Sequence, residues 1–233
     1  MLFLIIKLFI ETDMVINNYL RCISLFFVFG FSCTKENKTV VSETKQKSEV
    51  ILKEKQRLEI NYSKYYKEAK QYCQKNNLNQ DQFFLIDLGV HSGLKRFFVY
   101  DFKKDKISKS YMVSHGCGDN KWGATTSKEK APISNEFDSH CSSIGKFVVL
   151  DRGVSQWGIK VNYILQGKDN TNSNARSRAI VLHSWEAISS NETYPEGTPE
   201  GWGCPAVSNE SMTEIDALLK QNKKVLMWII KSS

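Results

Sequence analysis

The alternation of apolar and polar positions divides the chain into three stretches. The first thirty-odd residues are dominated by apolar side chains, and the stretch from Thr34 to about Ile60 mixes both charge signs without Gly or Pro. The rest carries short apolar runs separated by polar turns, and it is long enough to bury a sizeable core. The pattern predicts one domain at 61–233, preceded by an apolar segment at 1–33 and a charged tether at 34–60.

Seven short runs rich in β-branched or aromatic residues predict strands within the domain. Gly, Asn, Asp and Lys turns separate them. The runs are DQFFLIDLGV (81–90), RFFVYDF (96–102), KISKSYMVS (106–114), GKFVVLD (145–151), WGIKVNYIL (157–165), RAIVLHSW (178–185) and KVLMWII (224–230). They predict a mostly β fold whose sheet is mostly antiparallel.

Two stretches have helical spacing instead. NYSKYYKEAKQYCQKNN (61–77) predicts an amphipathic helix docked on the domain, with Cys73 as a small apolar core residue. Ser208 or Asn209 can cap a second helix over SMTEIDALLKQ (211–221), where acidic residues come early. Its buried stripe is expected to be Met212, Ile215, Leu218 and Leu219.

The stretch from Gly116 to Ser143 has no strand pattern and is rich in Gly, Ser, Thr and Asn. Loops of that length in compact domains usually serve as lids or binding walls. We therefore expect this stretch to border a functional site.

The N-terminal segment predicts export. Counted from Met14, it carries Arg21 and then an apolar run from Ile23 to Phe31, too short to span a bilayer but suited to a secretory signal. The run ends at Ser32-Cys33, which resembles a bacterial lipobox and implies a lipid on Cys33. An uncleaved signal anchor and an ordinary cleaved signal remain alternatives, as do Met1 and Met14 as the start. Each alternative places the domain in the cell envelope; the lipobox makes it a membrane-anchored lipoprotein facing the periplasm or the cell surface.

Composition agrees with a globular domain and argues against nucleic acid as a partner. Hydrophobic residues make up 41% and charged residues 24% of the chain, with 4 prolines. The formal net charge is +7, but the basic residues do not cluster among aromatics as in nucleic-acid binders. An exported basic protein meets anionic cell wall or lipid head groups instead.

Two cysteines in glycine-containing turns are candidate nucleophiles: Cys117 in Ser114-His115-Gly116-Cys117, and Cys204 in Gly201-Trp202-Gly203-Cys204. A free thiol has a pKa of about 8.5, so it needs a neighbouring base and donors for the oxyanion. His183 ends a predicted strand, and Cys204 lies shortly before the late predicted helix, whose N-terminus would favour a low thiol pKa. Gly203 lets the backbone approach a substrate closely.

The stretch from His183 to Ile229 resembles the catalytic end of the YkuD-type L,D-transpeptidases of bacterial cell walls. Their pattern is a His, about 14 to 17 residues, Ser/Thr-His-Gly-Cys, then Ser-Asn heading a helix and a final strand. Here 17 residues separate His183 from Gly201. Gly201 and Trp202 replace the Ser/Thr and the second His, and Pro205-Ala206 also departs from the pattern. The chain therefore resembles the divergent murein L,D-transpeptidase catalytic domain branch, with strand order similar from about Asp81 to Ile230.

The same spacing rejects the Ser114–Cys117 match. Counting back from Ser114 reaches RFFV (96–99), which has no His, and no capped helix follows Cys117. Cys204 is therefore the predicted nucleophile.

The resemblance implies a β-sandwich or barrel-like fold with a few helices, and a set of residue roles. Cys204 would attack a stem-peptide carbonyl, His183 would act as base, and the carbonyl of Ser184 would orient its ring. Backbone N–H groups around Gly203 and Cys204 would hold the oxyanion. An amine of a second stem would resolve the thioester, and neither a metal nor an organic cofactor is needed.

Further residues are assigned to the substrate groove: Trp202, Trp185, His115 and His140. Trp202 offers either its indole N–H or packing beneath the site, and packing is favoured. His115, Cys117, His140 and Cys141 could instead hold zinc, although an adjacent pair chelates one metal poorly. A Cys117–Cys141 disulfide and plain loop packing are the other readings.

Three rival functions remain open at this point. Water could resolve the thioester, which would make the protein an L,D-carboxypeptidase or hydrolase with the same Cys-His pair. A non-catalytic wall-binding lipoprotein on the same scaffold is the second rival. A papain-like protease fits worst, because here the Cys follows its His.

Overall fold

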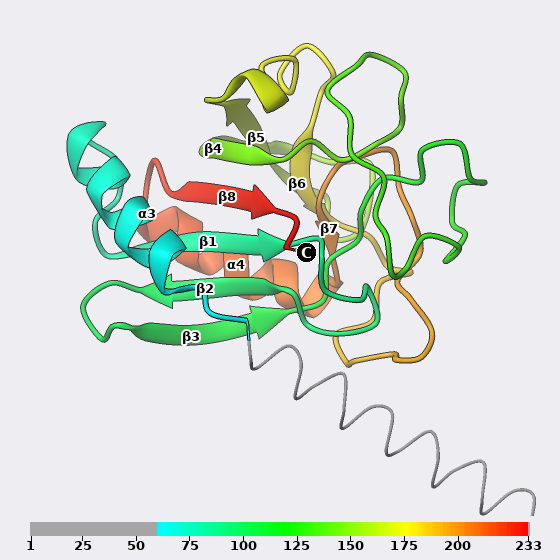
Figure 1. Cartoon of the computed structure of the whole chain (residues 1–233), viewed down its shortest axis with the longest axis horizontal. Coiled ribbons are helices and arrows are strands. Elements are labelled where there is room, and N and C mark those ends of the chain that lie inside the picture. Colours follow the sequence, from blue (N-terminus) through cyan, green and yellow to red (C-terminus); the bar gives the residue numbers. More distant parts are fainter. Residues whose placement is uncertain (1–59, 233) are drawn as a thin grey trace, which may run out of the picture. The chain divides into compact units, whose positions relative to one another are not determined.

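The computed structural model describes residues 60–232. The expected signal segment with Cys33, and the tether up to residue 59, lie outside the described residues. Within them, eight strands form one sheet in the order β3-β2-β1-β8-β4-β5-β6-β7 (Figure 1). The strands are β1 (Gln82–Asp87), β2 (Phe97–Asp101), β3 (Lys106–Tyr111), β4 (Gly145–Val154), β5 (Val161–Gly167), β6 (Val181–Ser184), β7 (Ala206–Val207) and β8 (Leu226–Ile230).

The predicted mostly β, mostly antiparallel architecture is confirmed. Every predicted run contains a strand, and the strand pairs are antiparallel except β1 with β8 and β6 with β7. The pattern missed only β7, because two residues are too few to show a period of two. The stretch from Gly116 to Ser143 is irregular as predicted, attached by isolated bridges at Gly116–Gly201 and Ile133–Ser142.

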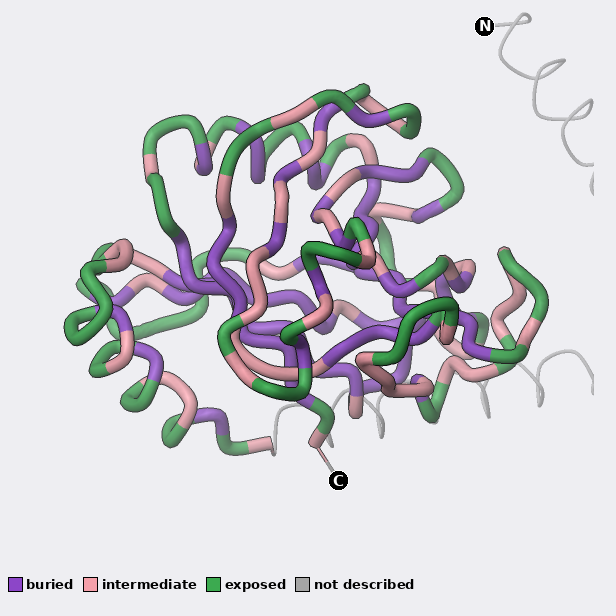
Figure 2. The backbone as a smooth tube through the Cα atoms, turned by 90° about the horizontal axis from the view of Figure 1, so that it is seen from above, coloured by how far each residue is buried: buried purple, intermediate pink, exposed green. Residues whose placement is uncertain are grey.

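Two helices cover opposite faces of the part of the sheet around β1 and β8 (Figure 1). Alternate side chains explain why: Phe83 and Leu85 pack with the α3 side chains, whereas Phe84 and Ile86 face the larger core. That larger core also holds buried residues of β4, β5, β6 and α4. The sheet thus borders one main core, and the buried parts of the chain run through the middle of the molecule while exposed parts form its outer turns (Figure 2).

Helix α3 (Ser63–Lys75) docks through aromatic contacts, as the spacing predicts. Tyr66 stacks on Tyr100 with ring centroids 3.8 Å apart, and Tyr65 meets Trp228 edge-on at 5.1 Å. Cys73 is fully buried in this cluster, which confirms its core role, and burial raises the pKa of its thiol to about 12. No helix within residues 60–232 is long and apolar enough to cross a bilayer.

Helix α4 (Asn209–Gln221) begins at the predicted Ser208 cap, whose side chain accepts from Ser211 N. Asp216 fastens this helix to the sheet: its carboxylate accepts from Tyr163 Oη at 2.8 Å and from Arg152 Nε at 2.6 Å. Burial alone would raise the pKa of Asp216, but hydrogen bonds from Arg152, Lys220 and Tyr163 outweigh it and lower the pKa.

We expect Asp216→Asn to lower the free energy of unfolding by about 2 kcal/mol at pH 7, because the buried Tyr163 hydroxyl and the exposed cations of Arg152 and Lys220 lose a charged acceptor. The pKa of Asp216 is lower in the folded protein than in the unfolded chain, where it is ~3.9, so the ionised carboxylate stabilises the fold at pH values above ~3.9. This stabilisation decreases as the pH falls toward the pKa of the folded state. Denaturant unfolding at several pH values should therefore show the difference shrinking below about pH 4.

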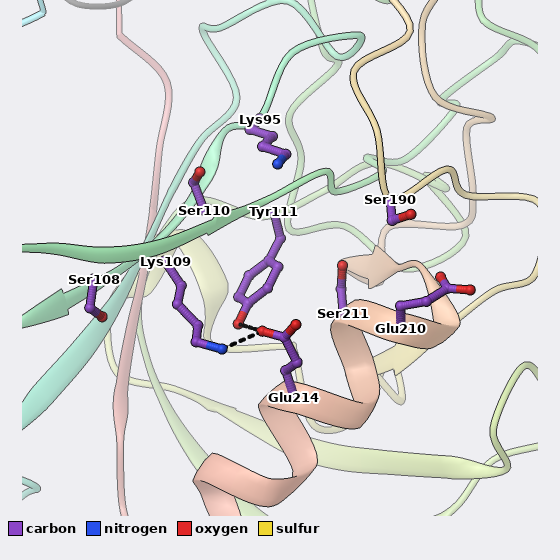
Figure 3. Close-up of a pocket in the computed structure, with 9 residues that line it drawn as sticks. All are labelled: Lys95, Ser108, Lys109, Ser110, Tyr111, Ser190, Glu210, Ser211 and Glu214. Carbon is purple, nitrogen blue, oxygen red and sulfur yellow. Dashed lines mark hydrogen bonds and ion pairs between the residues drawn. The ribbon is translucent and has the colours of Figure 1, made fainter.

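Glu214 on the same helix provides the matched control. It pairs with Lys109 at 2.5 Å, both side chains are 49% exposed, and Tyr111 also donates to it (Figure 3). Glu214→Gln should cost no more than about 1 kcal/mol. An Asp216→Asn loss that is equally large at pH 3 and pH 7 would contradict the ionic explanation.

Candidate active site

The predicted base and nucleophile line one cavity of about 430 Å³ beside β6 and β7. Leu182 and Ser184 of β6 point into the protein, so His183 faces the other way, half-buried. Strand β7 runs parallel to β6 with Ala206 opposite His183, which brings Cys204 beside the start of β6. The cavity lining is Ser114, Trp122, Trp157, His183, Trp185, Gly201, Trp202, Cys204 and Ala206.

The imidazole of His183 is oriented by a hydrogen bond to the backbone of the next residue, Ser184. Its Nδ1 lies 2.9 Å from the carbonyl oxygen of Ser184, the contact that the family resemblance implies. A carbonyl can only accept, so Nδ1 carries the hydrogen and Nε2 keeps its lone pair. Burial lowers the pKa of His183, opposed by the Ser184 hydrogen bond and the charge of Glu186. The ring is therefore a neutral base at pH 7.

The Cys204 thiol rests against the start of β6. Its Sγ accepts from Val181 N at 3.4 Å and lies 3.8 Å from the carbonyl oxygen of Ala179. Burial raises the pKa of this thiol, although the Val181 N–H and the charge of Arg178 act in the opposite direction. Within residues 60–232, no hydrogen bond joins Sγ to the His183 ring, so the resting pair is a thiol and a neutral imidazole.

The expectation that a helix N-terminus lowers the thiol pKa is wrong. Helix α4 starts at Asn209, and β7 lies between it and Cys204. The helix dipole acts within the first turn of a helix, so it does not reach the thiol.

Gly203 has a backbone that other residues adopt poorly. Its φ is +98°, and a Cβ there would lie 2.3 Å from the carbonyl oxygen of Cys141. Close packing of the long loop against the turn before Cys204 therefore requires glycine. Within the described residues, no hydrogen bond joins the N–H of Gly203 or of Cys204 to another group of the chain.

We expect Gly203→Ala to lower the free energy of unfolding by about 2 kcal/mol or more, through backbone strain and the clash with Cys141. Gly201→Ala is the matched control, since a Cβ at Gly201 meets nothing within 4 Å. Thermal unfolding of the two variants should separate them, with Gly201→Ala near the wild-type value. Equal melting temperatures for both would contradict the required close approach.

Arg178 holds the long loop against this turn, and no signal in the sequence singled it out. Its Nη1 donates to Ser143 Oγ at 2.8 Å and to the Ser134 carbonyl oxygen at 3.2 Å. Its Nη2 donates to the Cys141 carbonyl oxygen at 2.8 Å. One guanidinium thus fixes the loop carbonyl that packs on Gly203 and places a positive charge near Cys204.

The second candidate thiol, Cys117, is unsuited to catalysis. It is 1% exposed, and burial raises its pKa. Its segment lies beside the turn that carries Cys204, because Cys117 N donates to the Gly201 carbonyl oxygen and Gly201 N donates to that of His115, each at 2.8 Å. The Ser-His-Gly-Cys match is therefore a buried support for the turn that carries Cys204.

The predicted substrate contact of His115 needs correction. The ring is fully buried, with Nδ1 2.8 Å from Arg96 Nη2 and Nε2 2.9 Å from Ser127 Oγ. Burial and the charge of Arg96 lower the pKa of His115 to about 2. His115 therefore belongs to an interior network and is absent from the cavity lining.

The other predicted groove residues lie at or near the cavity. Trp185 is a buried part of its wall, and Trp202 lies at its edge. The prediction that Trp202 packs beneath the site is wrong. Trp202 is 62% exposed and stacks on the exposed His140 ring, with ring centroids 5.2 Å apart. Sequence reasoning missed Trp122 and Trp157, which complete the aromatic wall.

Cys117 and Cys141 are free thiols in the structure. Among the described residues, no three His, Cys, Asp or Glu side chains gather as a metal site. Another pocket, of about 390 Å³ near Glu214, is lined by Lys, Ser, Tyr and Glu, with neither Cys nor His (Figure 3). The cavity at Cys204 is thus the one of these two that combines a thiol with a base.

Comparisons with known proteins place this geometry in context. A family model described as "L,D-transpeptidase catalytic domain" matches residues 55–228. No curated protein matches the chain.

Similar solved structures include proteins from three bacteria. The L,D-transpeptidase of Xylanimonas cellulosilytica is 13% identical, with a TM-score of 0.36 over 64% of this chain and 59% of that one. The helical cell shape determining protein Pgp2 of Campylobacter jejuni is 12% identical, with a TM-score of 0.42 over 65% and 48%. Bd1075 of Bdellovibrio bacteriovorus is 13% identical, with a TM-score of 0.39 over 66% and 49%. The chain thus spans less than two thirds of each of these structures.

Proposed function

This chain belongs to the L,D-transpeptidase catalytic domain family, and we propose that it cross-links peptidoglycan stem peptides through a thioester on Cys204. The observation that carries the proposal is the orientation of His183. Its Nδ1–H is bound to the Ser184 carbonyl, which leaves Nε2 unprotonated in a cavity that Cys204 also lines. A neutral base beside a thiol is what nucleophilic acyl transfer needs at neutral pH.

The first half-reaction forms the acyl-enzyme. His183 Nε2 takes the thiol proton as Sγ attacks the carbonyl that links the diamino acid to the terminal D-Ala. The free N–H groups of Gly203 and Cys204 stabilise the negative charge that develops on the carbonyl oxygen. The protonated imidazole then gives its proton to the departing D-Ala amine, leaving a thioester.

The second half-reaction forms the cross-link. The side-chain amine of a second stem peptide attacks the thioester, its proton passes to His183, and the thiol is regenerated. The protein needs no metal or organic cofactor for these steps. Water in place of the amine would make the protein an L,D-carboxypeptidase or hydrolase with the same residues.

The deciding experiment incubates the full chain with disaccharide-tetrapeptide and measures intact-protein and product masses. A transient acyl adduct followed by a cross-linked dimer supports the transpeptidase. A tripeptide product without dimer would reassign the protein as a carboxypeptidase. Neither adduct nor product would favour a non-catalytic wall-binding protein and refute the proposed chemistry.

The proposal includes lipid anchoring at Cys33 and an envelope location, supported by the export pattern of the first 33 residues. Cys33→Ser should abolish incorporation of a labelled fatty acid and release the protein from the membrane fraction. Unchanged labelling and fractionation would contradict the lipobox assignment.

A further inference from the structure

Three tryptophans form an aromatic wall in the cavity that holds Cys204 and His183. Trp122 stacks on Trp185 with centroids 4.6 Å apart, and Trp157 meets Trp185 at 6.2 Å and Trp122 at 5.9 Å. Trp185 is the buried base of this group, whereas Trp122 is 42% and Trp157 43% exposed. The group, called the tryptophan platform below, thus presents large apolar surface at the mouth of a reactive site, where large exposed aromatic area usually marks a binding surface.

The side chains of this wall carry no charge that could pair with a charged group of a peptide. Apart from Cys204 and His183, the lining side chains are tryptophans, Ser114, Gly201 and Ala206, none of them ionisable. The hydroxyl of Ser114 is already engaged by Ala206 N at 3.1 Å. A stem peptide carries carboxylates and an ammonium group, and burying these against an uncharged wall costs free energy. The platform therefore suits an uncharged part of the substrate.

We propose that the tryptophan platform binds a sugar ring of the glycan strand that carries the donor stem peptide. A pyranose ring has a face of C–H groups that is apolar and slightly positive. Such a face matches the negative π-face of an indole, while the hydroxyls at its edge remain in water. This inference rests on the proposed function, because it assigns the recognition of the same substrate.

The reach of the substrate fits this placement. The reacting carbonyl belongs to the third residue of the stem, so an extended stem puts the sugar roughly 10 Å from Sγ. Cys204 and the platform line the same cavity of about 430 Å³, so a stem end at the thiol and a sugar ring on the platform would share one site.

The test measures binding to the full-length Cys204→Ala protein, which cannot turn over, by titration calorimetry. The probes are the disaccharide-tetrapeptide, the free tetrapeptide and the disaccharide alone. We expect the disaccharide-tetrapeptide to bind more tightly than the free tetrapeptide. Adding Trp122→Ala or Trp157→Ala should weaken binding of both sugar-containing probes by about three- to tenfold and leave free-tetrapeptide binding unchanged.

Two control variants make the test specific. Phe137→Ala removes an aromatic side chain that is 57% exposed but lies outside the cavity lining, and it should change none of the three affinities. Trp122→Tyr keeps an aromatic face and should retain most of the sugar-dependent binding. Equal weakening of the free tetrapeptide would mean that the platform holds peptide, and unchanged affinities for all probes would mean that it touches no substrate. Either result overturns the inference.

Failure of this inference can be told from failure of the proposed function. Acyl-adduct formation is measured on the protein with Cys204 intact, and sugar recognition on Cys204→Ala. A sugar preference without any acyl adduct would support the platform assignment and refute the thioester mechanism. An acyl adduct without a sugar preference would support the thioester mechanism and refute the platform assignment.

Discussion

Cys204→Ala is expected to eliminate the acyl-enzyme mass and to lower turnover of disaccharide-tetrapeptide by about 10⁴-fold or more. The thiol is the strongest nucleophile in the cavity lining, because the other side chains there are tryptophans, a histidine, a serine and small residues. The hydroxyl of the single serine in the lining, Ser114, already accepts a hydrogen bond from the backbone N–H of Ala206. Intact-protein mass spectrometry during turnover provides the measurement.

Cys117→Ala is the matched control, because it removes the other thiol that follows a glycine. The Cys117 side chain is buried and absent from the cavity lining, so the variant should keep the adduct and a rate within a few-fold of wild type. Loss of the adduct in Cys117→Ala with retention in Cys204→Ala would show that the nucleophile has been misassigned.

His183→Gln is expected to reduce the acylation rate at pH 7 by roughly 10² to 10⁴-fold. The burial of Cys204 raises its thiol pKa, so almost no thiolate forms at neutral pH without a base. Glutamine has hydrogen-bonding capacity but cannot take the proton. Single-turnover acylation kinetics would measure the loss.

The pH dependence separates this role from a purely structural one. The pKa of His183 is lowered, so the wild-type base should stay unprotonated as pH falls to the ordinary imidazole value near ~6.5, and activity should decline only below it. In His183→Gln the residual rate should instead climb steadily at alkaline pH, as free thiolate appears. A variant with wild-type rate at pH 7, or an acid limb centred above ~6.5 in wild type, would refute the general-base assignment.

Local patterns predicted much of the fold because each depends on neighbouring residues. Strand β1 is recognisable from four consecutive apolar residues (83–86), although only the structure shows that they pack alternately against α3 and in the main core. The Ser208 cap is likewise local, since its side chain bonds Ser211 N only three residues away. Strand pairing is not local: nothing in the pattern shows that β1 lies parallel to β8 across more than a hundred residues.

The residues of the candidate site likewise fall into those that local sequence patterns reveal and those that only the folded structure reveals. The His183 and Cys204 pair was accessible through family spacing, and its Ser184 contact lies within one residue. Trp122 reaches the site from the long loop, whereas Arg178 begins the same run as His183, and no short motif marks either residue. His115 was misjudged because a histidine beside the long loop was expected to line the substrate groove, whereas its burial against Arg96 emerges only when β2 packs beside the segment after β3.

The pairing of β6 with β7 has a consequence for how such a site can vary between related proteins. The approach of His183 to the Cys204 segment is set by the register of two paired strands, not by the number of residues that join them. Lengthening the intervening loop costs only a slowly growing closure entropy, so insertions there should leave the geometry of the pair intact. A shift of one residue in the pairing, by contrast, would turn His183 toward the interior and expose Leu182 or Ser184 in its place. The chemistry is therefore tolerant of loop length and intolerant of strand slippage.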